Sequence, residues 1–199
     1  MSIKDTLLDK YQEQMANLAL SAKKAQTWFN AKVKTVSGNE LMQDRPRLVT
    51  KGQLSRRHVG RLVMYYYDPK TKDKLPYYDR FPLSIIVDID NQGFYGLNLH
   101  YLPVGMRVKL LDALVTIYKN KQLDENKKLT MSYKLLKASS KTRFFKPCFK
   151  RYLYGHVRSR FYVVDPVEWE MVLTLPTERF EKKDKAFVWE ESKKSLGAK

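Results

Sequence analysis

The spacing of apolar residues changes twice along the chain, and these changes set the fold class. Residues 2 to about 37 repeat apolar side chains every three or four positions, which predicts one long amphipathic helix. Residues 60–101 instead form short alternating or aromatic blocks between turn signals, as antiparallel strands do. A helical spacing returns after Pro103. The pattern predicts an α+β fold: a small, curled antiparallel sheet of SH3-like type, several helices and a long N-terminal helix.

The expected N-terminal helix begins with Ser2 and Asp5 as a capping pair and ends at Gly38. Its apolar side chains form one narrow stripe: Leu7, Tyr11, Met15, Leu18, Ala22, Ala25, Phe29, Val33 and Val36. Such a stripe either lies across the chain's own domain or packs against another chain, and the sequence leaves both open.

The rest of the chain divides into short elements. Strands are expected at 60–67, about 81–90, 94–101, 157–164 and 169–176, and helices at 104–120, 130–139 and 147–154. The predicted organisation is an N-terminal helix (1–37), a basic linker (38–59), an α+β core domain (60–176) and a charged tail (177–199). Three aromatic residues are expected to anchor the tail: Phe180, Phe187 and Trp189.

Positive charge is concentrated in two segments that contain no acidic residue. The chain has 38 Lys and Arg against 21 Asp and Glu, a formal net charge of +17. Segment 45–67 holds six of the basic residues and segment 126–164 holds eleven, so the remainder of the chain is neutral. Concentrated positive charge attracts polyanions, which favours nucleic acid or an acidic partner chain. A basic surface that only aids solubility is the alternative.

The second basic segment also carries many aromatic rings. A basic groove is predicted from it, with three arginines of the first segment as a second arm, and the phosphate backbone of DNA as its ligand. The residues of this groove are Lys141, Arg143, Lys146, Lys150, Arg151, Arg158 and Arg160, with Arg56, Arg57 and Arg61. Alternation along 157–164 places Arg158, Arg160 and Tyr162 on one face of a strand. Four rings either stack on bases or belong to the core: Phe144, Phe145, Tyr152 and Tyr154.

No motif in the sequence indicates an enzyme, so no catalytic residue, metal site or cofactor is predicted. The three histidines fall in separate segments, no phosphate-binding glycine loop is present, and Cys148 has no motif that supplies a base. Asp88 and Asp90 are two residues apart on a strand and could hold Mg²⁺ in a nuclease, which is a minor alternative. The other interpretation is that they end a strand at a hairpin. Asn98 and His100 share a strand face, and a structural role is expected for them.

Several sequence blocks resemble virion proteins of T-even-type contractile-tailed phages. They are YYYDPKTKDKLPYYDRFPL, GFYGLNLHYLP, KLLDAL, KPCFKRYL and EWEMVLTLPTERF, and they span roughly residues 60–190. The resemblance implies a non-enzymatic protein packed with the virion. A DNA end protector or a related DNA-facing head and neck protein is the first candidate, and a baseplate or tail component is the second.

Charge and resemblance together predict a virion protein that binds duplex ends or packaged DNA through an electropositive groove. The alternative is a structural assembly protein of the neck, tail or baseplate, whose basic faces contact other protein chains. The expected partners are DNA and, through the N-terminal helix, other virion proteins. No membrane partner is expected, because the sequence shows no secretory signal and no membrane-length apolar run. No small-molecule substrate is expected either. The expected location is the virion, and the host cytoplasm during assembly.

Overall fold

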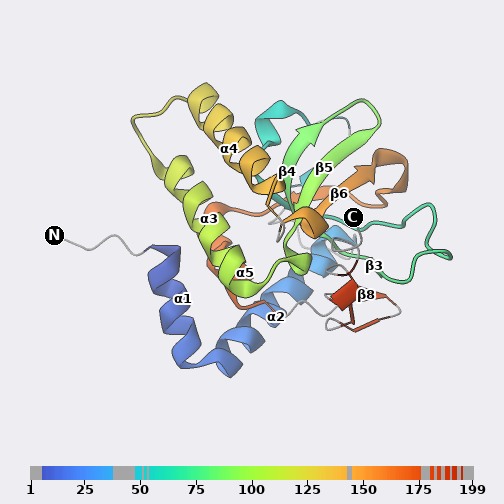
Figure 1. The fold of residues 1–199 in the computed structure, drawn as a ribbon, viewed down its shortest axis with the longest axis horizontal. Helices are drawn as coiled ribbons and strands as arrows, with labels where there is room; N and C mark the ends of the chain where they lie inside the picture. Colours follow the sequence, from blue (N-terminus) through green and yellow to red (C-terminus); the bar gives the residue numbers. More distant parts are fainter. Residues whose placement is uncertain are drawn as a thin grey trace.

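An open antiparallel sheet with helices packed around it forms the body of the molecule (Figure 1). The computed structural model describes residues 6–37, 48–50, 52, 54–142, 145–175, 180, 181, 183, 184, 187, 188, 190, 191 and 194. Within these residues the α+β class predicted from the sequence is confirmed. None of the described helices is long and apolar enough to cross a membrane.

The described residues form one six-stranded sheet and one two-stranded sheet. The spatial order of the larger sheet is β1 (Leu48–Val49), β7 (Phe161–Val163), β2 (Leu62–Met64), β4 (Leu83–Ile89), β5 (Gly93–Asn98) and β6 (Phe149–Leu153). The smaller sheet pairs β3 (Tyr78–Asp79) with β8 (Phe180–Glu181). Every pairing is antiparallel. Because β1 and β6 are the unpaired edges, the sheet is open, and an SH3-like closure is not confirmed.

The hairpin expected at residues 91–93 is confirmed. It joins β4 to β5, and the amide of Asp90 donates to the carbonyl of Gly93 at 2.9 Å. The carboxylate of Asp90 accepts the amides of Gln92 and Gly93, each at 2.8 Å. This local turn chemistry fixes the register of the two longest strands.

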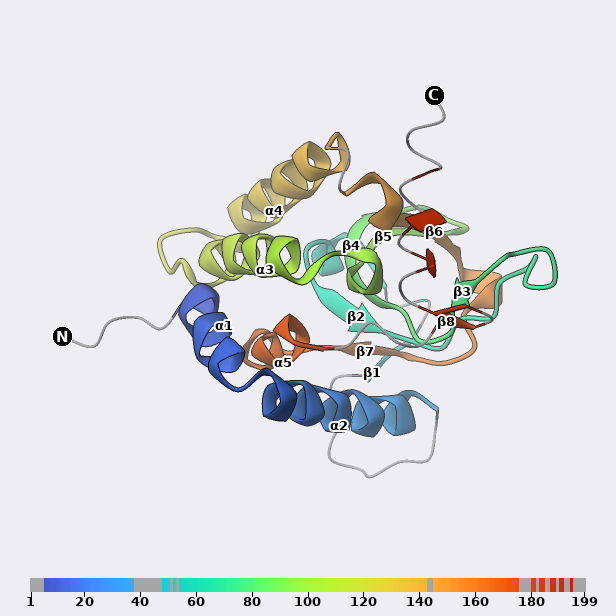
Figure 2. The same ribbon diagram turned by 60° about the horizontal axis from the view of Figure 1, so that its bottom comes forward.

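The helices pack on the sheet and on one another. They are α1 (Leu7–Ala16), α2 (Leu18–Val36), α3 (Val104–Lys119), α4 (Glu125–Ser140) and the single turn α5 (Glu170–Leu173). α1 contacts α3 and α5, α2 contacts α5 and β7, and α4 contacts α3 and β4, an arrangement visible in Figure 2. The helix expected at 104–120 is therefore confirmed, and the one expected at 130–139 begins earlier, because Asp124 caps it.

The predicted single N-terminal helix is wrong, because it is divided at Asn17. The Asn17 side chain accepts a hydrogen bond from the amide of Leu20 at 3.3 Å and so caps α2, while α1 ends there. α1 itself begins with a reciprocal capping box between Thr6 and Asp9. The expected pair Ser2 and Asp5, and the expected stop at Gly38, lie outside the described residues.

The predicted apolar stripe packs on the chain's own domain. Leu7, Ala25, Phe29 and Val36 are buried in the core. The stripe reaches solvent where the two helices meet, at Met15 and Leu18. The bend at Asn17 explains this, because it lets each helix turn its own apolar side toward the sheet and α5.

Two further secondary-structure predictions are wrong. Residues 149–153 form strand β6 after one 3₁₀ turn (Lys146–Cys148), where a helix over 147–154 was expected. Residues 170–173 form α5 after the 3₁₀ turn Pro166–Glu168, where a strand was expected. In the first case pairing with the edge of β5 overrides a weak helical pattern. In the second, Asp165 accepts the amide of Val167 and starts a helical turn.

Both faces of the sheet are buried. One face joins the helices in the larger core, around Leu62, Met64, Ile85 and Leu97. The other face carries a cluster of five aromatic rings: Tyr65, Tyr67, Phe94, Tyr152 and Phe161. Tyr65 packs edge to face on Phe94 and Tyr152, and its ring is tilted against Phe161. A sheet buried on both faces leaves its edges and the surrounding helices and loops to carry the surface chemistry.

Arg107 of α3 is a buried cation that holds the end of α5. Its guanidinium Nη1 donates to the carbonyls of Val172 and Leu175 at 2.7 and 2.9 Å, and Nη2 donates to the carbonyl of Leu102 at 3.3 Å. The side chain is fully buried, and this burial lowers the pKa of Arg107 to about 10. Its ligands are backbone carbonyls, so its role is structural.

Candidate nucleic-acid interface

A cationic hollow lies where the 3₁₀ turn Arg56–His58 and β2 face α3 and α4. Two adjoining depressions, of about 120 and 560 Å³, share four lining residues: Arg57, Arg61, Tyr118 and Glu125. We call this site the arginine hollow and define it by these residues together with Lys128, which lines the smaller depression. It brings together cations from both of the basic segments found in the sequence.

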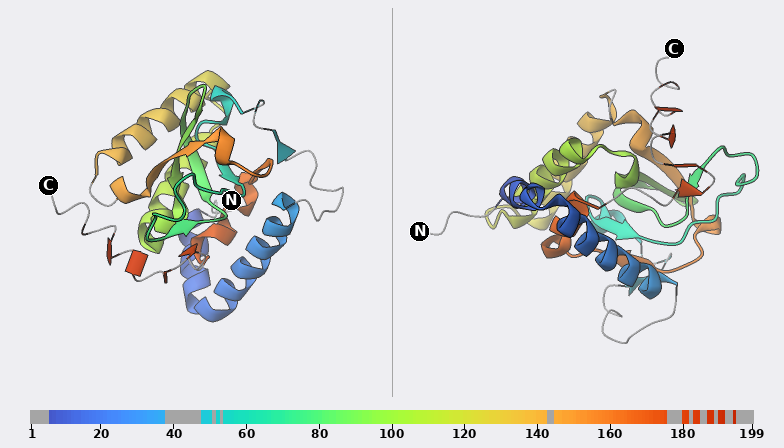
Figure 3. Two further views of the ribbon diagram at one scale, coloured as in Figure 1. Left: turned by 90° about the vertical axis from the view of Figure 1, so that its right-hand side faces the viewer. Right: turned by 90° about the horizontal axis from the view of Figure 1, so that it is seen from below.

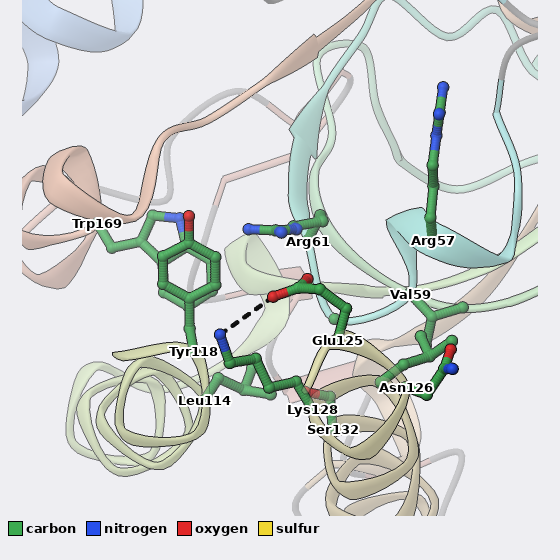
Figure 4. Close-up of a pocket in the computed structure, with 12 residues that line it drawn as sticks. Arg57, Val59, Arg61, Leu114, Tyr118, Glu125, Asn126, Lys128, Ser132 and Trp169 are labelled. Atoms are coloured by element: carbon green, nitrogen blue, oxygen red, sulfur yellow. Dashed lines mark hydrogen bonds and ion pairs between the residues drawn. The ribbon is translucent and has the colours of Figure 1, made fainter. Parts of the chain in front are cut away.

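The cations of the arginine hollow are arranged around one aromatic ring. The guanidinium carbon of Arg61 lies 4.5 Å from the centre of the Tyr118 ring, and the Lys128 ammonium lies 5.8 Å from it. Lys128 also pairs with Glu125 at 3.0 Å. Figure 4 shows Arg61 and Glu125 beside the Tyr118 ring, with Arg57 extending away from the others. Arg57 is exposed and is therefore open to an anionic ligand.

Gly60 allows the turn before β2 to approach α4 closely. Its φ angle is +81°, in the left-handed region that favours glycine. A Cβ at this position would lie 2.9 Å from Cβ of Ser132. The absence of a side chain at Gly60 thus allows the turn that carries Arg57 and Arg61 to line the hollow together with Ser132 of α4.

The arginines of the hollow influence the pKa of the buried His58. Burial lowers the pKa of its imidazole, a hydrogen bond with Ser55 raises it, and the charges of Arg57 and Arg61 lower it further. The imidazole Nδ1 lies 3.1 Å from the amide nitrogen of Ser55. Burial first, and the two arginines to a smaller extent, favour the neutral imidazole, which fits a wall of the hollow better than a proton donor.

A separate depression, of about 580 Å³, opens beside the edge of the sheet at β6. It is lined mainly by aromatic and aliphatic groups, with five tyrosines among them: Tyr67, Tyr77, Tyr78, Tyr101 and Tyr152. Three cations also line it: Lys70, Lys150 and Arg151. We call it the tyrosine pocket. Part of its wall is the segment between β2 and β3, which extends away from the sheet (Figure 3).

A buried polar network surrounds Asp79, which lines the tyrosine pocket. Oδ2 of Asp79 accepts hydrogen bonds from Nδ2 of Asn98 and from Nδ1 of His100, both at 2.7 Å. Oδ1 of Asp79 accepts the amide of Phe81 at 3.1 Å. Nδ2 of Asn98 also lies 3.1 Å from the hydroxyl of Tyr152. The structural role expected for Asn98 and His100 matches these contacts, since both side chains hold β3 against the end of β5.

The ten predicted groove residues do not gather into one groove. Arg57 and Arg61 line the arginine hollow, and Lys150 and Arg151 line the tyrosine pocket. Lys146 lines a further depression, separate from both. The remaining described members are exposed and do not line these depressions: Arg56, Lys141, Arg158 and Arg160. Arg143 lies outside the described residues. Two of the ten are paired with acids, Arg151 with Asp90 at 3.0 Å and Arg158 with Asp68 at 3.7 Å.

The aromatic residues expected beside the groove are mostly core residues. Phe145 and Tyr152 are buried, Tyr154 is half-buried, and Phe144 lies outside the described residues. The predicted cationic face of residues 157–164 is wrong, because Tyr162 is fully buried and Arg158 and Arg160 precede β7. Both faces of β7 are covered by the two cores, so alternation there does not separate core from solvent.

The acidic pair and the cysteine have local roles. The carboxylate of Asp90 accepts hydrogen bonds from its turn and from Arg151, and the carboxylate of Asp88 accepts the amide of Ile89 at 2.9 Å. In the described part of the chain, no three His, Cys, Asp or Glu side chains gather as metal ligands would. Cys148 is buried, and burial raises the pKa of its thiol to about 12, which suppresses nucleophilic thiolate chemistry.

Sequence reasoning missed residues that complete the arginine hollow and the tyrosine pocket. Lys128 falls in the second basic segment but is not among the predicted groove residues, and Tyr118 falls in the helix expected at 104–120. The tyrosines of the pocket come from separate segments, and the block LPYYDRF at 75–81 was the only local signal. Their convergence depends on tertiary packing, which local patterns do not encode.

A known protein family matches nearly the whole chain. The family model described as Phage T4 terminal DNA protecting protein matches residues 2–195. No curated protein and no solved structure matches the chain. The family match covers nearly the whole chain and confirms the resemblance to T-even-type virion proteins. This chain therefore belongs to the family of the phage T4 terminal DNA protecting protein.

Proposed function

We propose that this protein is a non-enzymatic DNA-binding protein of the virion that covers the ends of duplex DNA, with the arginine hollow as its main phosphate-binding surface. One observation carries the proposal: Arg57, Arg61 and Lys128 come from two separate basic segments and line the same hollow. The membership of the chain in a phage DNA protecting family supports DNA as the ligand.

The chemistry of the arginine hollow suits a phosphate backbone. Guanidinium groups match phosphate oxygens in a bidentate way, and Arg57 is exposed and has no carboxylate partner among the described residues. Tyr118 holds Arg61 by a cation–π contact and so limits its rotamers before DNA arrives. The acid of the hollow, Glu125, is paired with Lys128 and adds little repulsion.

The finer partner assignments belong to the same proposal. Other virion proteins would contact α1 and α2, which leave Leu8, Met15, Leu18 and Leu20 exposed. The protein would reside in the virion and, during assembly, in the host cytoplasm. Contact of the basic surfaces with acidic neighbours in a neck, tail or baseplate is the competing role.

The test compares a blunt linear duplex with a covalently closed circle of the same sequence, over a salt series with and without Mg²⁺. We expect tighter binding to the linear form, with an affinity that falls steeply with salt and DNA that stays intact. Equal binding to both forms would refute end recognition. Cleavage in Mg²⁺ would refute the non-enzymatic role, and no binding at about 0.1 M salt would favour the assembly role.

A further inference from the structure

The tyrosine pocket is separate from the arginine hollow and has a different composition. The two sites share no lining residue. Where the arginine hollow presents cations around one ring, the tyrosine pocket presents rings around few cations. A concave, mostly apolar site of about 580 Å³ with a few polar groups has the form of a site for one small group.

Lys150 is the cation of the tyrosine pocket that lies over an aromatic ring of its lining. Its ammonium lies 4.3 Å from the centre of the Tyr101 ring, and within the described residues no carboxylate pairs with it. The side chain is half-buried, and burial lowers the pKa of Lys150. A half-buried ammonium without an acid partner favours an anion as its ligand.

The acidic residue of the pocket does not fill this need. Both oxygens of Asp79 already accept hydrogen bonds, from Phe81 on one side and from Asn98 and His100 on the other. Arg151, at the same edge of the sheet, is paired with Asp90. The anion-binding capacity therefore centres on Lys150, with Lys70 in the neighbouring wall.

The rings around Lys150 suit a nucleobase. Tyr77 and Tyr78 are half-buried, so each keeps part of its surface exposed, whereas Tyr101 and Tyr152 are buried. Aromatic side chains stack on any base because every base has a π-face. A site for an anion next to a stacking surface for a base fits a nucleotide as the ligand.

A duplex can place a nucleotide in a pocket only by taking it out of the stack. Opening costs least at an end or at a mismatch, because fewer stacking and pairing contacts are lost there. A 5′-terminal phosphate monoester also carries more negative charge near neutral pH than an internal diester, since its second pKa is about 6.

We propose that the tyrosine pocket binds the 5′-phosphorylated terminal nucleotide of a DNA strand, with its phosphate at Lys150 and its base against Tyr77 and Tyr78. This inference rests on the proposed function, because the arginine hollow would hold the adjoining duplex. It adds a reason for end preference: only an end supplies both the doubly charged phosphate and an easily opened base.

The test measures affinity for four short duplexes that combine a 5′-phosphate or 5′-hydroxyl with a paired or mismatched terminal base pair. A closed circle is the end-free control. We expect the mismatched 5′-phosphate end to bind about tenfold more tightly than the paired 5′-hydroxyl end. Lys150→Gln should abolish the effect of the phosphate, and Tyr78→Leu should reduce the effect of the mismatch. Lys109→Gln, which removes an exposed charge on α3, should preserve both effects.

The outcomes separate this inference from the function on which it rests. If Arg57→Gln with Arg61→Gln weakens binding to every DNA while 5′-phosphate and mismatch make no difference, the pocket inference is wrong and the proposed function stands. If the protein binds no DNA, both are wrong. A free deoxynucleoside 5′-monophosphate that binds more tightly than any end would overturn the inference, because it would make the pocket a small-molecule site. Thermal unfolding of each variant shows whether it is folded, and Tyr78→Leu keeps the test valid if Lys150→Gln unfolds.

Discussion

The imidazole of His100 donates from Nδ1 to Oδ2 of Asp79 across 2.7 Å, with both side chains buried. This contact joins β3 to the 3₁₀ turn that follows β5 (Leu99–Tyr101), and Asp79 also lines the tyrosine pocket. Such a buried network stabilises the fold only when each of its polar groups has a hydrogen-bond partner, because an unpaired polar group in a buried site costs free energy.

Asp79→Ala should lower the free energy of unfolding by about 2–4 kcal/mol, since Asn98, His100 and the Phe81 amide would lose their acceptor in a buried site. Urea unfolding followed by tyrosine and tryptophan fluorescence measures the change. The matched control is Asp73→Ala, whose exposed carboxylate should contribute less than about 0.5 kcal/mol. Equal effects in the two variants would show that the network contributes no stability.

Replacing Arg57 and Arg61 with glutamine should weaken binding to duplex DNA of any sequence. Each lost phosphate contact should also reduce the slope of log affinity against log salt by about 0.9. Titrations of a labelled duplex at several salt concentrations measure both quantities. Lys24→Gln on α2 removes an exposed charge far from the hollow in sequence and should leave the slope unchanged. A slope unaltered by the double substitution would remove the arginine hollow from the interface.

Gly60→Ala should destabilise the protein by about 1–2 kcal/mol, because a Cβ at φ +81° is strained and would also press on Ser132. Thermal unfolding provides the comparison. Gly105→Ala is the control: nothing lies within 4 Å of a Cβ there, and in α3 the substitution should stabilise by about 0.5–1 kcal/mol. Any gain in stability at Gly60 would contradict the strained turn.

Arg107→Met should lower the free energy of unfolding by about 2 kcal/mol, because three backbone carbonyls lose their donor while the cost of burying a charge is relieved. Amide exchange should accelerate at residues 170–175, where α5 depends on these bonds. Arg107→Lys separates charge from geometry, since lysine keeps the charge without the planar fork. If the lysine variant matches the parent, the fork is dispensable.

The free energy of unfolding should decrease as the pH rises from about 9 to about 10. The unfolded thiol of Cys148 titrates near its ordinary pKa of 9.0, whereas burial keeps the folded thiol protonated up to a pKa of about 12. The folded state then binds more protons than the unfolded state, which costs about 1 kcal/mol over this interval. Chemical denaturation at the two pH values measures the loss. Cys148→Ala should remove most of it, and an unchanged loss in that variant would assign it to the tyrosines.

The parts of the fold that were predictable depend on local chemistry. The β4–β5 hairpin follows from Asp90 and Gly93 in one turn, and α3 follows from its apolar spacing after Pro103. Phe149–Leu153 was misassigned because its conformation is set by pairing with β5, more than fifty residues earlier. Asn17 was overlooked because the apolar spacing continues unbroken across the bend.

The sequence predicted the chemical character of the candidate site, which is basic, better than its location in the fold. Charge concentration identified Arg57, Arg61 and Lys150 as interface candidates, which is a property of composition along the chain. Their division between two depressions depends on the packing of α4 against α3 and on the wall before β3. These contacts link residues far apart in sequence, so periodicity carries no information about them.

The pairing of β3 with β8 also sets the order in which the protein can mature. Phe180, close to the C-terminal end of the chain, packs on Tyr101 with ring centres 4.7 Å apart and on Tyr77 at 6.0 Å. A ribosome completes β3 long before it releases β8, so the nascent chain holds the tyrosine wall without its outer support. The tyrosine wall therefore gains this support only once β8 has been synthesised, and a product truncated before β8 would lack the packing of Phe180 on Tyr77 and Tyr101.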